Sequence, residues 1–487
     1  MSTYQKPDIK TDFSNMPVWL WVIIALGLYL FGGYAFFDVI LDPANQEIFT
    51  AIGQTLAILI PLSLPFLPLF LLFGVLFLIV TFILAYVIVW IMSKLAQEVT
   101  IAVSILFPIV LIAVGGLLAT AGAASSDSET AGLLFVGIFI AGFGVLLLAF
   151  VIWKFTVIKR SGQFVEFSAQ LVLAEKAVLA MPVLLGLYSI VTGFFMLFGF
   201  IKIVTLFSVY NPATDAVEWS APGILAAIIF EYVYLIVYLG IYYSLSAAVI
   251  SYASDWYRGL DPDLNSAMKD VTQTLPVIIK FAFAMATVKI IISAVTQSGR
   301  QAMSSQRGQD NIGAAIGGFI FAAIGGFFIS ILGAIWMFLN YFTLVSIVQN
   351  KRHLTDSIKD SAKTTWNSLL DVLVGESGFG LTTFIFMIIN SILWVVTGFG
   401  LGWAVGQNIG YGIVVGVIFF ILGSLPYSVV TMPMKVAFRT FIYSFAKDTV
   451  EGFKKPSRLP TELRGELNEL RKREVKRRGM RDPSQYF

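Results

Sequence analysis

Apolar runs of about 20 residues or more recur along nearly the whole chain, and short polar breaks separate them. The hydrocarbon core of a bilayer is about 30 Å thick and requires about 20 helical residues for each crossing. The pattern therefore predicts about ten membrane spans. They cover residues 17–41, 66–92, 100–122, 132–156, 179–207, 222–250, 275–297, 315–349, 380–406 and 411–434.

Basic residues give these spans an orientation, because cytoplasmic loops are enriched in Lys and Arg. Loops on one side of the predicted topology hold most of the basic residues, whereas the opposite loops hold Arg300 and Arg307 alone. Both termini are therefore expected in the cytoplasm, in a multi-pass protein of the cell membrane. The first span shows no cleavage pattern and is expected to remain as an anchor. The resulting organisation is a cytoplasmic N-terminal tail, a transmembrane domain and a basic cytoplasmic C-terminal tail, at residues 1–16, 17–446 and 447–487.

Several cytoplasmic connections share one form, in which apolar residues recur at helical spacing around a charged pair ahead of the next span. They cover residues 164–185, 264–279 and 354–370, with a weaker fourth copy at 94–112. Met268-Lys269-Asp270 in the second aligns with Ile358-Lys359-Asp360 in the third. We expect short amphipathic elbow helices in the membrane interface, each followed by a two-span hairpin. Such internal duplication is common among transporters, but a stack of hairpins can also be purely structural.

Composition supports the same fold class. Of the 487 residues 58% are hydrophobic and only 13% are charged, and the mean hydropathy is +0.85. We therefore predict an all-α polytopic transmembrane helical bundle. The chain has no cysteine, which excludes disulfides, thiolate metal sites and cysteine nucleophiles. Its single histidine, His353, is the only residue around which a histidine-based triad could form, and it excludes a multi-histidine metal site. We expect no enzymatic activity, no cofactor and no metal.

Charges within the predicted spans are the candidates for function, because an unpaired charge near the bilayer centre costs about 2.5–3.5 kcal/mol on the insertion scale. Glu231 and Lys289 lie at similar depth in consecutive spans. They could form a structural ion pair, line a solute or proton path, or extend separately to headgroups. Tyr234, Tyr238 and Tyr242 follow Glu231 along one helix face, where aromatic rings and a carboxylate could receive an organic cation. The alternative for these tyrosines is a packed helix seam.

Other basic residues have a simpler interpretation as lipid-facing groups. Lys202 and Lys280 lie close to the ends of their spans, so that their stems can extend to the headgroups. The C-terminal tail is predicted to start a helix at Pro460 and becomes strongly basic toward its end, which includes Arg477 and Arg478. Anionic lipid of the inner leaflet is the simplest partner for such a segment, and plain topology marking is the alternative. Nucleic acid is not an expected partner, because no base-reading aromatics accompany the tail.

Residues 257–288 and 336–380 resemble a family of uncharacterised prokaryotic integral membrane proteins. The likeness lies in the turn with Gly259, Asp261 and Pro262, in an Ala-rich span, and in an elbow with Lys359, Ser361 and Trp366 ahead of Gly375 and Gly378. Members often carry an acid near the start of this elbow, where the present chain has Asn350 and Lys351. A fainter likeness to choline-transporter-like proteins rests on helix layout. The resemblance implies a polytopic membrane protein and no particular reaction.

Two functions are consistent with these features. The first is a transporter or channel-like protein for a small, cationic or amphiphilic solute, with Glu231 and Lys289 as its central charges. The second is a non-catalytic membrane scaffold or subunit that organises lipids or partner proteins through its elbows and tail. The scaffold would expose a large apolar face to partner membrane subunits or to a second copy of the chain.

Overall fold

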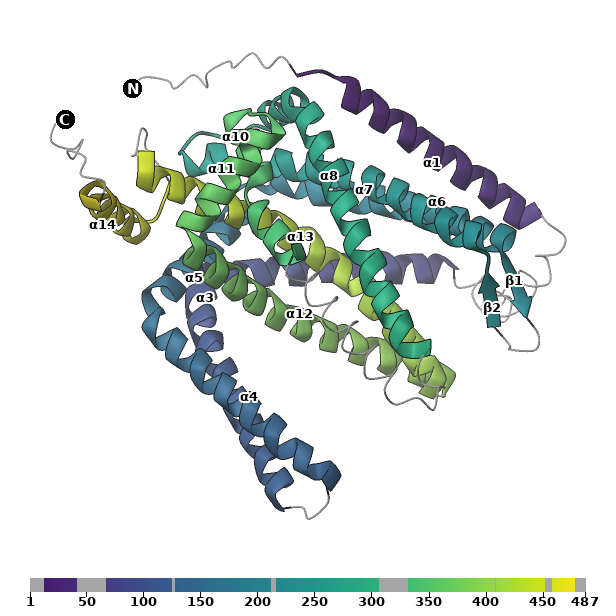
Figure 1. Cartoon of the computed structure of the whole chain (residues 1–487), viewed down its shortest axis with the longest axis horizontal. Coiled ribbons are helices and arrows are strands. Elements are labelled where there is room, and N and C mark those ends of the chain that lie inside the picture. The colour runs from purple at the N-terminus through teal and green to yellow at the C-terminus, as the bar shows by residue number, and fades with distance from the viewer. Residues whose placement is uncertain are drawn as a thin grey trace. The chain divides into compact units, whose positions relative to one another are not determined.

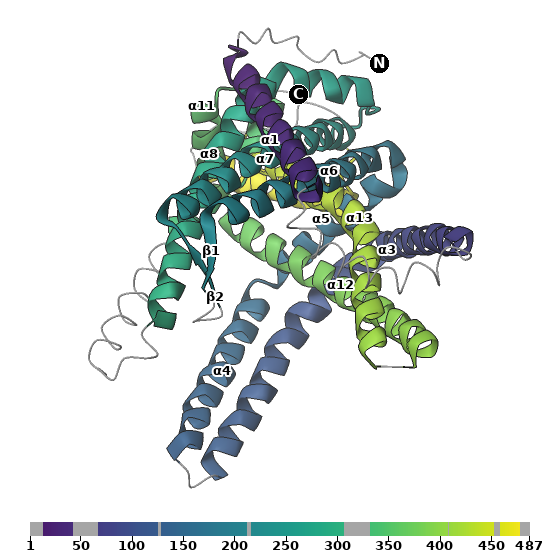
Figure 2. The same cartoon turned by 90° about the vertical axis from the view of Figure 1, so that its right-hand side faces the viewer.

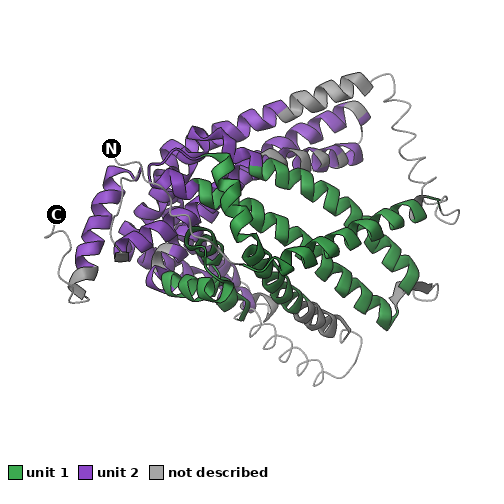
Figure 3. Cartoon of the chain, turned by 90° about the horizontal axis from the view of Figure 1, so that it is seen from above, with its two compact units in different colours: residues 1–74, 181–252, 263–365 green, residues 75–180, 253–262, 366–487 purple. Residues whose placement is uncertain are grey.

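The structure is a computed structural model that describes residues 13–41, 67–124, 128–211, 216–305, 332–407, 409–451 and 458–477. These residues are nearly all helical, and eight helices among them are long and apolar enough to cross a membrane, which fits a helical integral membrane protein. The chain divides into two compact units (Figure 3). Unit 1 comprises residues 1–74, 181–252 and 263–365, and unit 2 comprises residues 75–180, 253–262 and 366–487.

The predicted intramembrane charges Lys202, Glu231, Lys280 and Lys289 all lie in unit 1, on helices that Figure 1 labels α6, α7 and α8. Helices α7 and α11 each extend a few residues into unit 2, and α6 begins one residue before the segment 181–252 of unit 1. The helices of unit 1 are α1 (Met16–Leu41), α6 (Ala180–Phe207), α7 (Ala221–Tyr257), α8 (Leu264–Ser305), α10 (Thr343–Asn350) and α11 (Leu354–Asn367).

A short β-hairpin joins α6 to α7, and the all-α prediction did not include it. Strand β1 (Ser208–Asn211) pairs antiparallel with β2 (Ala216–Trp219), in a register that sets Ser208 opposite Trp219 (Figure 2). Val209, Tyr210 and Val217 are residues that favour strands, and their run is too short to stand out beside apolar runs of helical length. The structure therefore adds one hairpin to a helical fold.

Helix α1 packs closely on the other helices of unit 1. A Cβ atom on Gly32 would lie 2.6 Å from the carbonyl oxygen of Phe195, and a Cβ atom on Gly240 would lie within 3 Å of the Trp21 ring. The Trp21 indole N–H also donates a hydrogen bond of 3.1 Å to the Ile236 carbonyl oxygen in α7. Small residues here let large rings approach the helix backbone, as is usual between membrane helices.

Helix α3 (Leu67–Ala124) differs from the prediction, because it runs through two predicted spans, 66–92 and 100–122, without a break. The proposed elbow at 94–112 lies inside this 58-residue helix and is not a separate one. Figures 1 and 2 show that the ribbon of α3 has two directions and that its second part lies beside α4 (Ser128–Trp153). Helical hydrogen bonding continues through the polar stretch, so the polar residues do not end the helix.

Glycines bring α3 and α4 into backbone contact. A Cβ atom on Gly115 would lie 2.7 Å from the carbonyl oxygen of Gly137, and one on Gly137 would lie 2.6 Å from that of Gly115. Gly144 repeats this arrangement farther along, 2.9 Å from the carbonyl oxygen of Pro108. The pair forms a tight helical hairpin in which any larger residue would separate the two backbones.

The remaining elements of unit 2 are α5 (Phe155–Ala174), the 3₁₀ turn η1 (Lys176–Leu179), α12 (Leu369–Gly406), α13 (Ile409–Glu451) and α14 (Thr461–Arg477). Helix α5 covers part of the elbow predicted at 164–185, and α13 continues into the predicted C-terminal tail. Residues 164–185 thus contain the end of α5, η1 and the start of α6. Residues 264–279 likewise form the first part of α8 and not a helix of their own.

The C-terminal segment is packed against unit 2 over its first part. Helix α14 begins at Thr461, directly after the predicted start at Pro460; Leu463 and Leu467 of the helix are buried, as is Leu459 just before it. Arg160 of α5 forms an ion pair of 2.7 Å with Glu466 of α14. The predicted domain boundary at 446/447 falls within α13, which continues from the predicted transmembrane domain into the predicted tail.

Candidate functional site

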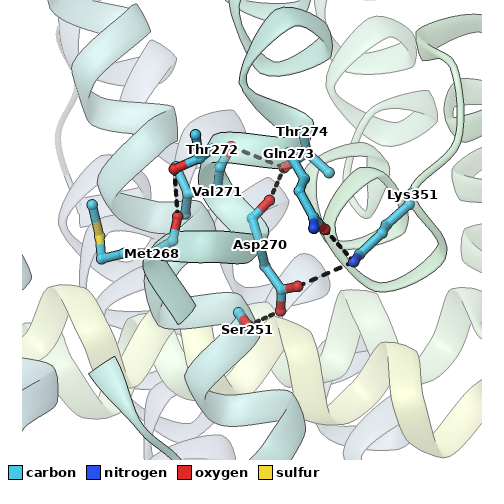
Figure 4. Close-up of polar contacts among 8 residues, drawn as sticks. All are labelled: Ser251, Met268, Asp270, Val271, Thr272, Gln273, Thr274 and Lys351. Atoms are coloured by element: carbon cyan, nitrogen blue, oxygen red, sulfur yellow. Dashed lines mark hydrogen bonds and ion pairs between the residues drawn. The ribbon is translucent and has the colours of Figure 1, made fainter. Parts of the chain in front are cut away.

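A buried ion pair lies where the start of α8 meets the end of α10 (Figure 4). The Lys351 ammonium lies 3.3 Å from a carboxylate oxygen of Asp270, and the two side chains are only 6% and 7% exposed. Removing both charges from water costs several kcal/mol per ion, which is offset only when the groups are paired and fully hydrogen-bonded. The start of α8 and the end of α10 can therefore meet here only if neighbouring groups supply the remaining hydrogen bonds to both ions.

Neighbouring side chains complete the pair. Ser251 at the end of α7 donates a hydrogen bond of 2.5 Å to the second oxygen of Asp270. Lys351 also donates to the side-chain oxygen of Gln273, one helical turn after Asp270. The Thr274 hydroxyl, which is fully buried, donates to the backbone carbonyl of Asp270. Both carboxylate oxygens thus have partners, and three separate helices meet at one acid (Figure 4).

The backbone of Lys351 is held in the left-handed region, with φ 48° and ψ 47°. It caps the C-terminus of α10, where its N–H donates to the Ile347 carbonyl oxygen. Glycine is the usual residue in this position, and a side chain there costs about 1 kcal/mol or more. The conformation directs the lysine away from its own helix to Asp270, so the buried pair explains why the strain is kept.

The second elbow repeats this arrangement. Asp360 of α11 is buried, and it accepts a hydrogen bond of 2.8 Å from Ser346 of α10. Asn350 donates to the same oxygen at 3.5 Å, and Arg352 lies 3.6 Å from the other. Asp270 and Asp360 are the aligned acids of the two elbow segments. We call Ser251, Asp270, Gln273, Ser346, Asn350, Lys351, Arg352 and Asp360 the elbow joint.

Helix α11 turns a polar face toward the protein. Its buried residues are Ser357, Asp360, Ser361, Thr364 and Thr365, and the backbone N–H of Phe342 donates to the Ser361 hydroxyl at 2.9 Å. Trp366 on this helix is 70% exposed. The apolar residues Leu354, Ile358 and Ala362 are only half-buried. This distribution is the reverse of that in a helix packed on a soluble core, where the apolar face is buried.

An open hollow lies on the outer side of the joint. Its volume is about 430 Å³, and it is lined by Arg352, Asp356, Lys359, Asp360 and Lys363. Asp360 is thus shared, since it contributes to the buried joint and to the wall of the hollow. The other four residues are exposed.

The predicted intramembrane charges lie near the same level of α7 and α8, but the structure does not join them. Tyr232 and Thr287 are hydrogen-bonded at 2.9 Å across the two helices, one residue after Glu231 and two residues before Lys289. Glu231 is half-buried and Lys289 is exposed. Within the described part of the chain, neither of these two charges has an ion-pair or hydrogen-bond partner.

The predicted tyrosine stripe is present as a stack. Tyr234 and Tyr238 have ring centroids 6.0 Å apart and an interplanar angle of 19°, and for Tyr238 and Tyr242 the values are 6.2 Å and 16°. All three rings pack beside the buried cluster of Leu235, Ile236, Leu239, Ala282 and Ala286 between α7 and α8. This packing is what a helix seam requires.

The predicted lipid-facing basic residues differ from one another. Lys202 does not extend alone to the headgroups, because it forms an ion pair of 2.5 Å with Asp38 of α1 and is only 15% exposed. Lys280 is exposed, as expected for a lipid-facing lysine. Arg477 is the last residue of α14, its side chain lies outside the described residues, and Arg478 lies outside them altogether.

Unit 2 also places an acid on its elbow, in α5. Burial raises the pKa of Glu166, and the nearby negative charge of Glu98 raises it further, while Lys94 acts in the opposite direction. Gln170 donates a hydrogen bond to Glu166 at 3.4 Å. Because this carboxyl group is more easily protonated when folded, its charge opposes folding at neutral pH, and the opposition decreases as the pH falls toward its raised pKa.

Sequence reasoning found Asp270 and Asp360 as aligned residues but missed their partners. The only signal was the repeated charged pair at one point of each elbow. Lys351 and Arg352 lie far from Asp270 in the sequence, and nothing in the sequence pattern marks a lysine for the left-handed conformation.

We predict that Lys351→Met lowers the free energy of unfolding by about 3–5 kcal/mol, because it leaves the buried Asp270 carboxylate without its cation. The measurement is SDS-induced unfolding in mixed micelles, followed by circular dichroism. Lys472→Met, which removes an exposed partner of Glu469, is the control and should change stability by less than about 1 kcal/mol.

Asp270→Asn combined with Lys351→Met should recover most of the loss, since no charge then remains buried. An equal loss in the double variant would show that the two residues are not coupled.

No family model matches the chain, and no similar curated protein is found. The likeness of residues 257–288 and 336–380 to an uncharacterised membrane family, and the fainter one to choline-transporter-like proteins, stay predictions. Function has to be inferred from the elbow joint, the hollow and the charges of α7 and α8.

Proposed function

We propose that the chain is a ten-span membrane protein whose elbow helices form a fixed polar platform at the cytoplasmic membrane surface. Its role there is to organise anionic lipid as a scaffold, without catalysis. The observation that carries this proposal is the polar burial of α11, with its half-buried apolar stripe and exposed Trp366.

Helix lengths support ten crossings. A straight helix of 58 residues such as α3 would be about 87 Å long, far beyond a core of about 30 Å. Two crossings joined by a polar stretch fit this length, and Lys94 and Glu98 between the two predicted spans are exposed. The predicted span 411–434 lies within α13 and supplies the last crossing.

The two elbows of unit 1 support a surface platform. Each buries its aspartate and a threonine, Asp270 with Thr274 and Asp360 with Thr364, while apolar residues such as Met268 and Ile358 are left exposed or half-buried. An apolar edge that the protein covers only in part, beside exposed lysines, suits the boundary between headgroups and acyl chains. The equivalent placement of aligned residues favours an origin by duplication.

Ile358→Cys and Asp356→Cys test this placement, because the chain has no native cysteine and the two positions lie on opposite sides of α11. Spin labels are attached to each variant in lipid nanodiscs, and their accessibility to oxygen and to a water-soluble nickel complex is measured. We expect the label at 358 to favour oxygen and the label at 356 to favour nickel. Equal, high accessibility of both labels to nickel would contradict a membrane-surface position.

Transport is the second candidate, and Glu231 favours it. This half-buried acid in α7 has no ion-pair partner among the described residues, and a stack of three tyrosines follows it. An acid in such a position marks a substrate or proton path in many membrane proteins. Lys289 would then act as a separate exposed charge near the same level.

If transport is the function, Glu231→Gln should reduce the uptake of radiolabelled tetraethylammonium into proteoliposomes by tenfold or more, because the cation loses its counter-charge. Lys280→Gln, at an exposed position, is the control and should leave uptake unchanged. Uptake by the wild-type protein no faster than by empty liposomes, or unchanged uptake in the Glu231 variant, would reject this candidate.

A further inference from the structure

We propose that the hollow beside the elbow joint binds the headgroup of an anionic phosphodiester lipid that also carries hydroxyl donors, with phosphatidylglycerol as the type. The inference rests on the placement of α11 at the membrane surface in the proposed function, and it adds the ligand and its residues.

Uncompensated positive charge is the first argument. Lys359 and Lys363 are four residues apart on α11, a spacing at which like charges repel each other. Within the described residues neither ammonium group has an ion-pair or hydrogen-bond partner, although Asp356 and Asp360 are close in sequence. An anion placed between these two lysines would relieve the repulsion and gain two charge-assisted hydrogen bonds.

The balance of charge limits the type of anion. The walls carry three cations, Arg352, Lys359 and Lys363, and two carboxylates, Asp356 and Asp360, which leaves one net positive charge. Arg352 is partly committed to Asp360, at 3.6 Å. A phosphodiester with one negative charge matches this wall, whereas a phosphate with several charges would be repelled by the two acids.

The free carboxylate adds a second requirement. Asp356 is exposed and has no hydrogen-bond or ion-pair partner in the described part of the chain. As an ionised acid it only accepts hydrogen bonds, so a ligand with hydroxyl groups would satisfy it. Glycerol headgroups carry such hydroxyls, and choline headgroups carry none.

Shape favours a lipid over a soluble phosphate. The hollow is open, and its volume of about 430 Å³ lies at the lower end of the range of about 300–1,000 Å³ for small-molecule sites. An enclosed site for a lipid would have to hold its acyl chains as well as its headgroup. An open one needs to hold only the headgroup, while the acyl chains stay in the surrounding bilayer.

The test uses the full chain in non-ionic detergent, titrated with phosphatidylglycerol and with phosphatidylcholine, with bound lipid counted by native mass spectrometry. Phosphatidylglycerol should bind more tightly to the wild-type protein. Lys359→Gln combined with Lys363→Gln should weaken its binding roughly thirtyfold and leave that of phosphatidylcholine unchanged. Both lysines are exposed, so the fold should be retained, which circular dichroism checks.

Lys269→Gln is the matched control, because Lys269 is the aligned, exposed lysine of the other elbow and does not line the hollow. It should leave phosphatidylglycerol binding unchanged, and an equal loss in this variant would overturn the site. Equal binding of both lipids to the wild-type protein would also overturn it.

A third titration, with glycerophosphoglycerol, the water-soluble phosphodiester headgroup of phosphatidylglycerol, separates the sources of the headgroup. Binding of this soluble compound as tight as that of the lipid, and lost in the double variant, would show a site for a soluble phosphodiester and overturn the lipid assignment. If the spin labels also place α11 in water, the proposed function fails while the anion site stands. If the labels place α11 at the membrane and phosphatidylglycerol binding is unaffected, only the site fails.

Discussion

The buried pair of Asp270 and Lys351 is the interaction on which the elbow region of unit 1 depends. Two charges that are less than a tenth exposed are stable only with each other and with hydrogen bonds to every remaining oxygen. Meeting this condition fixes the end of α7 through Ser251, the start of α8 through Asp270, and the turn after α10 through Lys351. A left-handed lysine is part of the solution, because an ordinary helical conformation would direct the side chain elsewhere.

The positions of the turn at 350–352 and of α11 follow from this joint. The turn at 350–352 that delivers Lys351 to one elbow also delivers Asn350 and Arg352 to Asp360 of the other. With Asp360 satisfied, α11 buries its hydroxyl-bearing face and presents Lys359 and Lys363 outward, while its apolar stripe is half-buried. A polar interior under an amphipathic exterior is the arrangement that a surface helix in lipid requires. The hollow exists because this helix is fixed in place.

Hydropathy predicted the membrane class and the position of most helices, because length and apolarity are properties of each segment by itself. The two spans predicted at 66–92 and 100–122 lie in one continuous helix, α3, since a polar stretch such as Lys94 to Glu98 ends an apolar run without ending helical hydrogen bonding. The β-hairpin was missed because two short strands carry little signal. The tyrosine stripe followed from helical periodicity and is present as a stack. The ion-pair partners could not be predicted in the same way, because pairing depends on tertiary contacts between segments that are distant in the sequence. Lys202 pairs with Asp38, and Asp270 pairs with Lys351.

The central claim is that this ionic joint holds the two elbow segments, the start of α8 and the helix α11, in one fixed arrangement. The direct measurement is the distance between spin labels at Lys269→Cys and Lys359→Cys, two exposed positions on the two elbows, by pulsed electron paramagnetic resonance in nanodiscs. The account predicts one narrow distance distribution, which Lys351→Met broadens or splits. A distribution that is already broad with Lys351 present, or one that its replacement leaves unchanged, would contradict the account.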